Sequence, residues 1–225
     1  MGSDDLFHKR RKKAEKSLKR SQAKRDAYDR VLIVCEGEKT EPHYLQELID
    51  HLKLNSANVL VDGRSSSSPD KVWQYAKERY REAERRGDVF DRVYCVIDRD
   101  SHTTFDQTLV EIRKSRPNGV FHATPSVPCF EYWVLLHFDY KTAPYTRTGS
   151  NSPCDCVIAD LKRYMPGYTK GDKGVFYQIM SDTDRAIALS KLTLAEAHKT
   201  GTDNPTTLMH ELVDYLRHLK NGTRS

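Results

Sequence analysis

Short runs of apolar residues, separated by segments with helical periodicity, constrain the fold of this chain most strongly. Residues 31–35 (VLIVC) are five consecutive apolar residues, a pattern typical of a strand buried on both faces, as in a parallel sheet. Residues 92–97 (RVYCVI) predict another buried strand, and residues 58–61 and 119–124 predict two more. The first half of the chain therefore contains four predicted strands.

The segments between these strands have helical features. In residues 41–52 the apolar side chains recur at helical spacing, and Pro42 occupies an early helical position. Residues 70–86 predict a second helix, which ends at Gly87, and residues 104–115 predict a third. Because strands alternate with helices, we predict an α/β fold with a mostly parallel sheet of about four strands flanked by helices.

The pattern changes after residue 128. Residues 130–138 are a dense apolar segment that predicts a helix, and residues 139–153 predict a loop rich in Thr, Pro, Gly and Ser. The last helix is expected to begin with Asn204 as its N-cap and Pro205 at its first position. No strand pattern is visible in this part of the sequence, and mostly helical stretches are predicted at residues 154–164, 174–199 and 205–219.

These patterns divide the chain into three predicted parts. They are a basic N-terminal extension at residues 1–30, an α/β catalytic core at residues 31–140 and a helical C-terminal part at residues 141–225 that packs on the core. Together they give enough chain for a sizeable hydrophobic core.

The composition excludes several classes of protein. Charged residues make up 31% of the sequence, and no apolar run approaches the roughly 18 to 20 residues that a membrane helix needs. The first residues, MGSDDLFHKRRKK, lack the apolar region of a signal peptide, so we expect a cytoplasmic protein without a membrane partner. The five cysteines are odd in number and have no C-x-x-C spacing, so neither a disulfide framework nor a zinc site is predicted.

The positive charge of the chain is concentrated at its N-terminus. Residues 1–30 hold 11 Lys and Arg against 5 Asp and Glu, whereas the whole chain has a net charge of +5. Such an arm is either a solvated basic tail or an electrostatic clamp on a phosphate backbone, driven by counterion release. In the second interpretation the nucleic-acid-binding residues of the arm are Lys9, Arg10, Arg11, Lys12 and Lys13.

Acidic side chains follow two of the predicted buried strands. Glu36 comes directly after residues 31–35, and Asp98 and Asp100 come directly after residues 92–97. Ligands of parallel α/β sheets bind at the carboxyl ends of the strands, and residues two apart on a strand point the same way. Carboxylate oxygens suit Mg²⁺ or Mn²⁺, so these acids predict a metal site, with helix caps or solvated loop residues as the alternative.

Four further residues are candidates for the same site. Glu131 lies in an apolar segment and predicts a metal ligand or active-site anchor, with an ion pair to a surface arginine as the alternative. Lys170 and Lys173 lie in a glycine-rich loop and are candidates to neutralise a scissile phosphate, unless that loop is simply solvated. Lys39, close to the first acid, is a candidate phosphate contact.

Longer motifs add a family resemblance. The sequences CEGEKTEP at residues 35–42, IDRD at 97–100 and PCFEYWVLLHF at 128–138 are followed by PGYTK at 166–170 and DNPTT at 203–207. Together they resemble the RloB-like family of small Toprim proteins, which are often encoded beside an ATPase, RloA, in bacterial defence or restriction–modification loci. The resemblance extends from about residue 30 to residue 220 and implies a Toprim-like core.

The resemblance also implies roles for the acids. In Toprim enzymes the first glutamate is a general acid/base and the Asp-x-Asp pair holds the first metal, which here gives these roles to Glu36, Asp98 and Asp100. The related overcoming-lysogenization-defect nucleases use a second acid four residues after the first, for a second metal. Because Thr40 occupies that position here, we assign the second metal to Glu41, with Glu38 as a competitor.

Other families that use an Asp-x-Asp motif fit less well. Haloacid dehalogenase-type phosphatases require Thr or Val two residues after the second aspartate, where this chain has His102. No G-x-x-x-x-G-K-[ST] motif is present, so the chain is not itself predicted to be an ATPase.

Two functions follow as hypotheses. The first is a metal-dependent nuclease that cleaves DNA or RNA, tRNA included, with one or two Mg²⁺ or Mn²⁺ ions, in antiphage defence with an RloA-type ATPase partner. The second is a non-catalytic nucleic-acid-binding adaptor of a defence or restriction–modification complex. The substrate and the activating signal stay open, as does the oligomeric state, for which a homo-oligomer is one candidate.

Overall fold

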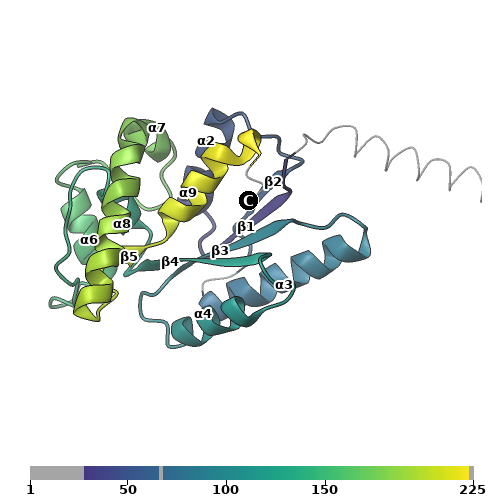
Figure 1. Cartoon of the computed structure of the whole chain (residues 1–225). Coiled ribbons are helices and arrows are strands. Elements are labelled where there is room, and N and C mark those ends of the chain that lie inside the picture. Colours follow the sequence, from purple (N-terminus) through teal and green to yellow (C-terminus); the bar gives the residue numbers. More distant parts are fainter. Residues whose placement is uncertain (1–27, 66–67, 223–225) are drawn as a thin grey trace, which may run out of the picture.

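The computed structural model describes residues 28–65 and 68–222, and within them the chain forms an α/β fold around one mixed sheet. In these residues the sheet has five strands in the order β2-β1-β3-β4-β5 (Figure 1). The first four are parallel, and β5 is antiparallel to β4. The strands are β1 (Val31–Cys35), β2 (Val59–Asp62), β3 (Arg92–Asp98), β4 (Phe121–Val127) and β5 (Thr206–Thr207).

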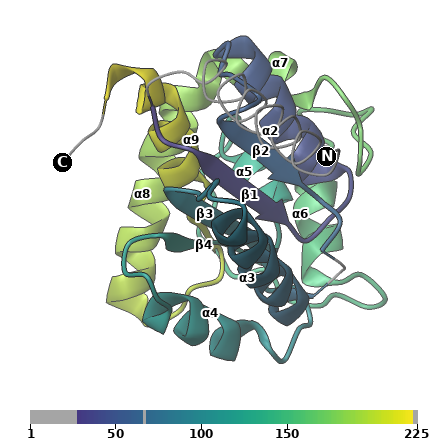
Figure 2. The ribbon, with the colours of Figure 1, turned by 90° about the vertical axis from the view of Figure 1, so that its right-hand side faces the viewer.

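Alternate side chains of β1 face opposite layers, because successive residues of a strand point to opposite sides of the sheet. Leu32 and Val34 pack with α3 (Pro69–Arg85) and α4 (Phe105–Lys114) on one face. Ile33 packs with α2 (Thr40–His51) and the C-terminal helices on the other. Figure 1 shows α3 and α4 below the sheet and α2, α8 and α9 above it, and Figure 2 shows β1 between β2 and β3.

The C-terminal helices share the hydrophobic core of α2. Trp133, Phe176 and Leu212, which lie on three different helices, are buried in one cluster with Tyr44 of α2. The helices are α5 (Glu131–Leu135), α6 (Pro153–Leu161), α7 (Val175–Ile179), α8 (Thr183–Thr200) and α9 (Met209–His218), with the 3-10 turns η1 (Met180–Asp182) and η2 (Leu219–Asn221). The predicted fold class, a mostly parallel sheet flanked by helices with a helical C-terminal part, is confirmed.

Two details of the C-terminal part were predicted incorrectly. The segment expected to begin the last helix instead forms β5, and α9 begins at Met209 with Leu208 before it. Asn204 is not the N-cap: its side chain accepts a hydrogen bond from the Tyr145 N–H and donates one to the Tyr145 carbonyl. A strand of two residues has no readable periodicity, which is why the sequence predicted about four strands rather than five.

Some predictions lie beyond what the structure tests. Lys9, Arg10, Arg11, Lys12 and Lys13 lie outside the described residues, and the boundaries at residues 30 and 140 stay predictions. Within the described residues, no helix combines the length and the apolar composition needed to cross a membrane.

The connections that follow β1 and β3 leave the sheet on opposite faces. The chain leaves β1 into α2 on one face, whereas it leaves β3 into α4 on the opposite face. Because β1 and β3 are neighbours, their carboxyl ends are where the strand order reverses. In open α/β sheets this switch point is where ligands bind, so the topology directs attention to the residues after β1 and β3.

Candidate metal centre

Glu36 and Asp98 meet at this switch point. The Glu36 N–H continues the ladder between β1 and β3 by donating to the Val96 carbonyl over 3.1 Å. Glu36 Oε2 in turn accepts a hydrogen bond from the Asp98 N–H over 3.1 Å. The parallel register that pairs Cys35 with Val96 therefore brings these two acids together, as strand order and chain position predicted.

Two buried acids join them from neighbouring helices. Glu41, in the first turn of α2, is 6% exposed, and Glu131, the first residue of α5, is 2% exposed. Burial raises the pKa of Glu41 to about 7, and the charges of Glu131 and Glu36 act in the same direction. Of the two competing acids after β1, Glu41 therefore belongs to the buried cluster, whereas Glu38 is exposed.

The carboxylate of Asp98 is the least satisfied member of this cluster. Its Oδ2 accepts a hydrogen bond from the Phe130 N–H over 3.1 Å, but its Oδ1 is buried and has no hydrogen-bond partner among the described residues. Burial raises the pKa of Asp98 well above its usual range, and the charges of Glu41 and Glu131 raise it further. An unpartnered buried carboxylate oxygen surrounded by other acids is the arrangement that a bound cation would stabilise.

Asp100 is placed differently from the sequence expectation. Strand β3 ends at Asp98, and Asp100 lies in the turn that follows, with a φ of 33° and its N–H donating to the Pro128 carbonyl. Strand alternation therefore does not relate the two aspartates. Asp100 is exposed, yet it lies close enough to Glu36 for its charge to raise the pKa of that carboxyl.

Lys170 supplies positive charge to the acids. Its Nζ lies 3.5 Å from Glu131 Oε1, and its side chain is 53% exposed. Burial lowers the pKa of Lys170, but the charges of Glu131, Asp98 and Glu41 outweigh it and raise the pKa above its ordinary value. The Tyr168 hydroxyl also donates to Glu131 Oε1 over 3.2 Å. The alternative in which Glu131 pairs with a surface arginine is therefore wrong, because a lysine and a tyrosine bind it.

The other two predicted lysines lie at the periphery. Lys39 is exposed, and its stem lies against the loop of Lys170, since a Cβ built on Gly171 would be 3.2 Å from Lys39 Cβ. Lys173 is exposed and lines a pocket of about 290 Å³ with Tyr168. None of the clustered acids at the ends of β1 and β3 lines this pocket. Lys39 thus lies against the loop of Lys170, whereas Lys173 faces the Tyr168 pocket rather than the acid cluster.

His102 is a member of the site that the sequence analysis did not assign. It lies in the turn between β3 and α4, and its Nε2 is 2.9 Å from Glu36 Oε1. Burial raises the pKa of Glu36, while the Asp98 N–H and His102 oppose that increase. The motif Asp98-x-Asp100-x-His102 contained the clue, but the histidine served there only to exclude a phosphatase motif.

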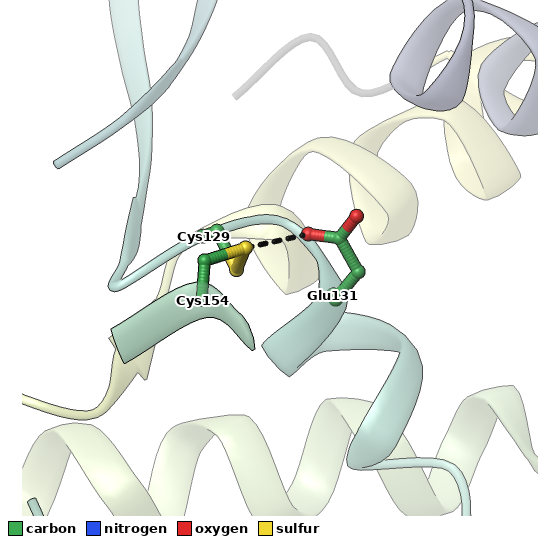
Figure 3. A group of neighbouring side chains, drawn as sticks. All are labelled: Cys129, Glu131 and Cys154. Carbon is green, nitrogen blue, oxygen red and sulfur yellow. Dashed lines mark hydrogen bonds between the residues drawn. A yellow bond between two sulfur atoms is a disulfide. The ribbon is translucent and has the colours of Figure 1, made fainter. Parts of the chain in front are cut away.

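A pair of cysteines lies directly beside Glu131 (Figure 3). Cys129 and Cys154 form a disulfide, and Cys154 Sγ lies 3.4 Å from Glu131 Oε2. The ligand atoms of these three buried residues lie within 4.8 Å of one another. Only a reduced Cys154 thiol can donate to Glu131, so this contact is a hydrogen bond in the reduced protein alone. The sequence analysis predicted no disulfide from the odd number of cysteines and their spacing, and this pair, 25 residues apart, corrects that prediction.

The donor set of the acid cluster fits a hard divalent cation. Glu36, Asp98, Glu41 and Glu131 offer carboxylate oxygens, which Mg²⁺ and Mn²⁺ prefer, and Asp98 Oδ1 has no hydrogen-bond partner in the part of the chain that the structure describes. Asp100 adds a fifth, solvent-facing carboxylate near Glu36. These acids are therefore the candidate cation ligands at the carboxyl ends of β1 and β3, with Lys170 and His102 at their margins. Within the described residues, the one group of three potential metal-ligating side chains whose ligand atoms already lie within 4.8 Å of one another is Cys129, Glu131 and Cys154.

Comparison with known proteins gives one family. The family model described as RloB-like protein matches residues 31–216, which include all of the described acids of the cluster. No curated protein and no solved structure matches the chain.

Proposed function

The chain belongs to the RloB-like protein family, and on this premise we propose that it is a metal-dependent nuclease that hydrolyses phosphodiester bonds in DNA or RNA. The observation that carries the proposal is the buried Asp98 Oδ1, which has no hydrogen-bond partner within residues 28–65 and 68–222 and lies among the carboxylates of Glu36, Glu41 and Glu131. Enzymes that transfer phosphoryl groups use such acid clusters to hold divalent ions against a phosphate.

Each acid has a proposed role. Glu36, Asp98 and Asp100 would hold a first Mg²⁺ or Mn²⁺, and Glu41 and Glu131 would hold a second or anchor the first. Bound there, the ions would draw charge from the scissile phosphate and favour attack by water. The Toprim resemblance adds proton transfer to the role of Glu36.

The residues around the acids support the same reaction. His102 holds Glu36 Oε1 from one side while the Asp98 N–H holds Oε2, so the carboxylate that would move the proton is fixed in orientation. Lys170 would contribute positive charge where the leaving oxygen becomes anionic, and Lys39 would contact a neighbouring phosphate.

The proposed substrate is a polyanion that the basic N-terminal residues 1–30 help to bind. Their 11 Lys and Arg against 5 Asp and Glu favour a phosphate backbone over a small molecule. Lys173, exposed on the loop of Lys170, would extend this contact. We further propose that the protein acts in the bacterial cytoplasm in antiphage defence with an RloA-type ATPase, and that tRNA is among the substrates to test.

The test is incubation of the purified full chain with plasmid, single-stranded DNA and total tRNA in Mg²⁺ or Mn²⁺. Wild type should cut at least one of them, and Asp98→Asn and Glu36→Gln should not. Asp50→Asn is the matched control, because Asp50 is an exposed acid in the last turn of α2, away from Glu41 in its first turn. Cleavage that persists in Asp98→Asn at the wild-type rate would refute the assignment.

A calorimetric titration with Mn²⁺ separates the nuclease from the adaptor. The nuclease requires Mn²⁺ binding that Asp98→Asn abolishes. An adaptor would instead bind nucleic acid equally well after mutation of Glu36, Asp98 and Asp100 and would lose binding when residues 1–30 are removed. If no substrate is cut with or without the ATPase and that second pattern is found, the adaptor replaces the proposed nuclease.

A further inference from the structure

The loop after β2 is attached to the end of β1. The β1–β2 register pairs Val34 with Asp62, the last residue of β2, and β1 ends one residue later at Cys35. Beyond the strands, a Cβ on Gly63 would be 2.7 Å from the Gly37 carbonyl oxygen and 3.1 Å from Glu38 Cα, so this position requires glycine for the two chain segments to touch. Arg64 therefore begins its side chain beside the Gly37–Glu38 turn, which directly follows Glu36.

A buried carboxylate fixes the guanidinium of Arg64. Its Nε donates to Asp62 Oδ1 over 2.9 Å and its Nη2 to Oδ2 over 2.8 Å, which is a two-bond fork on one carboxylate. Asp62 is itself buried and also accepts from the Tyr75 hydroxyl over 2.9 Å. Burial would raise the pKa of Asp62, but the bonds from Arg64 and Tyr75 outweigh it, so the pKa is lowered and the carboxylate stays charged.

A second arginine shares the Asp62 carboxylate. Arg79 Nε lies 3.6 Å from the same Asp62 Oδ2, so two guanidinium groups share this carboxylate, and Arg79 also binds Glu82 at 3.2 Å. Asp62 is the only acid within ion-pair distance of Arg64 in the part of the chain that the structure describes. The Arg64 side chain nevertheless stays 75% exposed, which leaves its remaining N–H groups to solvent.

We propose that Arg64 binds a backbone phosphate of the nucleic acid, next to the phosphate that reacts at Glu36. The inference rests on the proposed nuclease function and specifies where its substrate lies. A guanidinium matches a phosphate with paired N–H donors, and one already fixed by Asp62 loses little rotamer freedom on binding. Arg64 also lies on the β2 side of Glu36, whereas Asp98 and Asp100 follow β3 on the other side. The positive charge of Arg64 thus attracts the phosphate backbone of a nucleic acid, which the negative charges of Asp98 and Asp100 repel.

The experiment measures binding without cleavage. The full chain is titrated against fluorescently labelled single-stranded DNA and tRNA in EDTA, over a series of salt concentrations, and anisotropy is recorded. Arg64→Ala should weaken binding roughly five- to tenfold and reduce the salt slope by about one unit. The affinity of Arg64→Lys should lie between those of wild type and Arg64→Ala, because an ammonium keeps the positive charge but cannot make the two-bond contact of a guanidinium.

Arg86→Ala is the matched control. Arg86 directly follows α3, is 73% exposed and is ion-paired to Glu82 at 3.8 Å, so it has the charge and exposure of Arg64 without the two-bond fork on Asp62. It should leave both affinity and slope within about twofold of wild type. Asp62→Asn should keep the salt slope while weakening binding less than Arg64→Ala, because the charge remains but its position is lost.

The outcomes separate the two proposals. If wild type binds and cuts nucleic acid but Arg64→Ala binds with unchanged affinity and slope, the Arg64 assignment is wrong and the nuclease stands. If Arg86→Ala weakens binding as much as Arg64→Ala, the effect is general charge and the Arg64 site is also wrong. If wild type neither binds nor cuts any of these substrates, both proposals fail together. Thermal unfolding of each variant, expected within a few degrees of wild type, shows that the fold is retained.

Discussion

The backbone N–H of Asp98 donates a hydrogen bond over 3.1 Å to the side chain of Glu36, so one acid is positioned by the main chain of the other. The Asp98 carboxylate is left with one hydrogen bond, from Phe130, and a bare Oδ1 in the described residues. Buried carboxylates this close repel one another when all are ionised. The ends of β1 and β3 therefore hold negative charge that the protein groups around it balance only in part.

The first prediction concerns the response of stability to metal. Mn²⁺ at about 100 times its Kd should stabilise the wild-type protein by roughly 2.7 kcal/mol, because it binds the folded acids and not the unfolded chain. Asp98→Asn should abolish this stabilisation and should raise the Tm of the metal-free protein, because a repelled buried charge is removed. Thermal unfolding with and without Mn²⁺ measures both effects, with Asp50→Asn as control. Equal stabilisation of Asp98→Asn and wild type would contradict the site.

The second prediction concerns pH. Because the pKa of Glu41 is raised to about 7 in the folded protein, its ionisation opposes folding. The metal-free protein should thus lose about 3 kcal/mol of stability from this residue as pH rises from about 4.5 to above 7. Glu41→Gln should lack this pH-dependent loss, so the difference in unfolding free energy between the variant and wild type should grow with pH. Urea unfolding in EDTA at pH 5 and pH 8 tests this prediction. If the unfolding free energies of Glu41→Gln and wild type differ by the same amount at both pH values, the prediction is refuted.

The third prediction uses a glycine that the site requires. A Cβ on Gly37 would lie 2.7 Å from Glu41 Oε2, so Gly37→Ala must displace the Glu41 carboxylate or the turn. We expect a cost of about 1 to 3 kcal/mol and weaker Mn²⁺ binding. Gly167→Ala is the control, because a Cβ there meets nothing within 4 Å and should change stability by less than about 1 kcal/mol. Indistinguishable variants in urea unfolding and calorimetry would show that the contact is unimportant.

The fourth prediction concerns the ion pair of Lys170 and Glu131. Lys170→Met should cost roughly 1 to 2 kcal/mol, because it leaves the buried Glu131 charge to Tyr168 alone, although the exposure of Lys170 limits the loss. In a Glu131→Gln background the same change should cost little. A double-mutant cycle in urea should therefore give a coupling of roughly 1 kcal/mol, and additive effects would show that the two charges do not interact.

The fifth prediction concerns the cysteines, all five of which lie in described residues. In the oxidised, denatured protein, alkylation should modify Cys35, Cys95 and Cys156 but not the pair, and reduction should expose all five. Reduction should also lower stability by about 3 kcal/mol, as closure of a loop of this size predicts. Mass spectrometry counts the modified thiols, with Cys156→Ser as a control that keeps the pair. Five reactive thiols before reduction would contradict the disulfide.

The parts of the fold that the sequence predicted are those with strong local patterns. Residues 31–35 and 93–97 are unbroken apolar runs, and each lies in a central strand of the sheet. Their order along the chain was enough to place Glu36 and Asp98 at one edge, because parallel neighbours end together. β5 was missed because two residues carry no period, and the antiparallel pairing that creates it comes from β4.

The residues of the candidate site likewise divide into those that the sequence predicted and those that only the structure revealed. Glu41 was predicted from a family resemblance, and its burial distinguishes it from Glu38. His102 and Arg64 were not predicted, because an exposed turn residue gains its role only from the acid that it meets in space. The pairing of Cys129 with Cys154 was likewise not predicted, because the spacing of cysteines in the sequence does not show which of them the folded chain brings together.

The sequence by itself determined the α/β alternation, the ends of the strands on which the acids lie and the family to which the chain belongs. These depend on residue type and local spacing, which the chain carries wherever it folds. Only the tertiary structure decided which acids are buried together, that Asp98 Oδ1 lacks a hydrogen-bond partner among the described residues, and that Asp62 fixes the guanidinium of Arg64. The physical reason is that desolvation and charge–charge interactions depend on distances between segments, and these distances are set when the helices pack against the sheet.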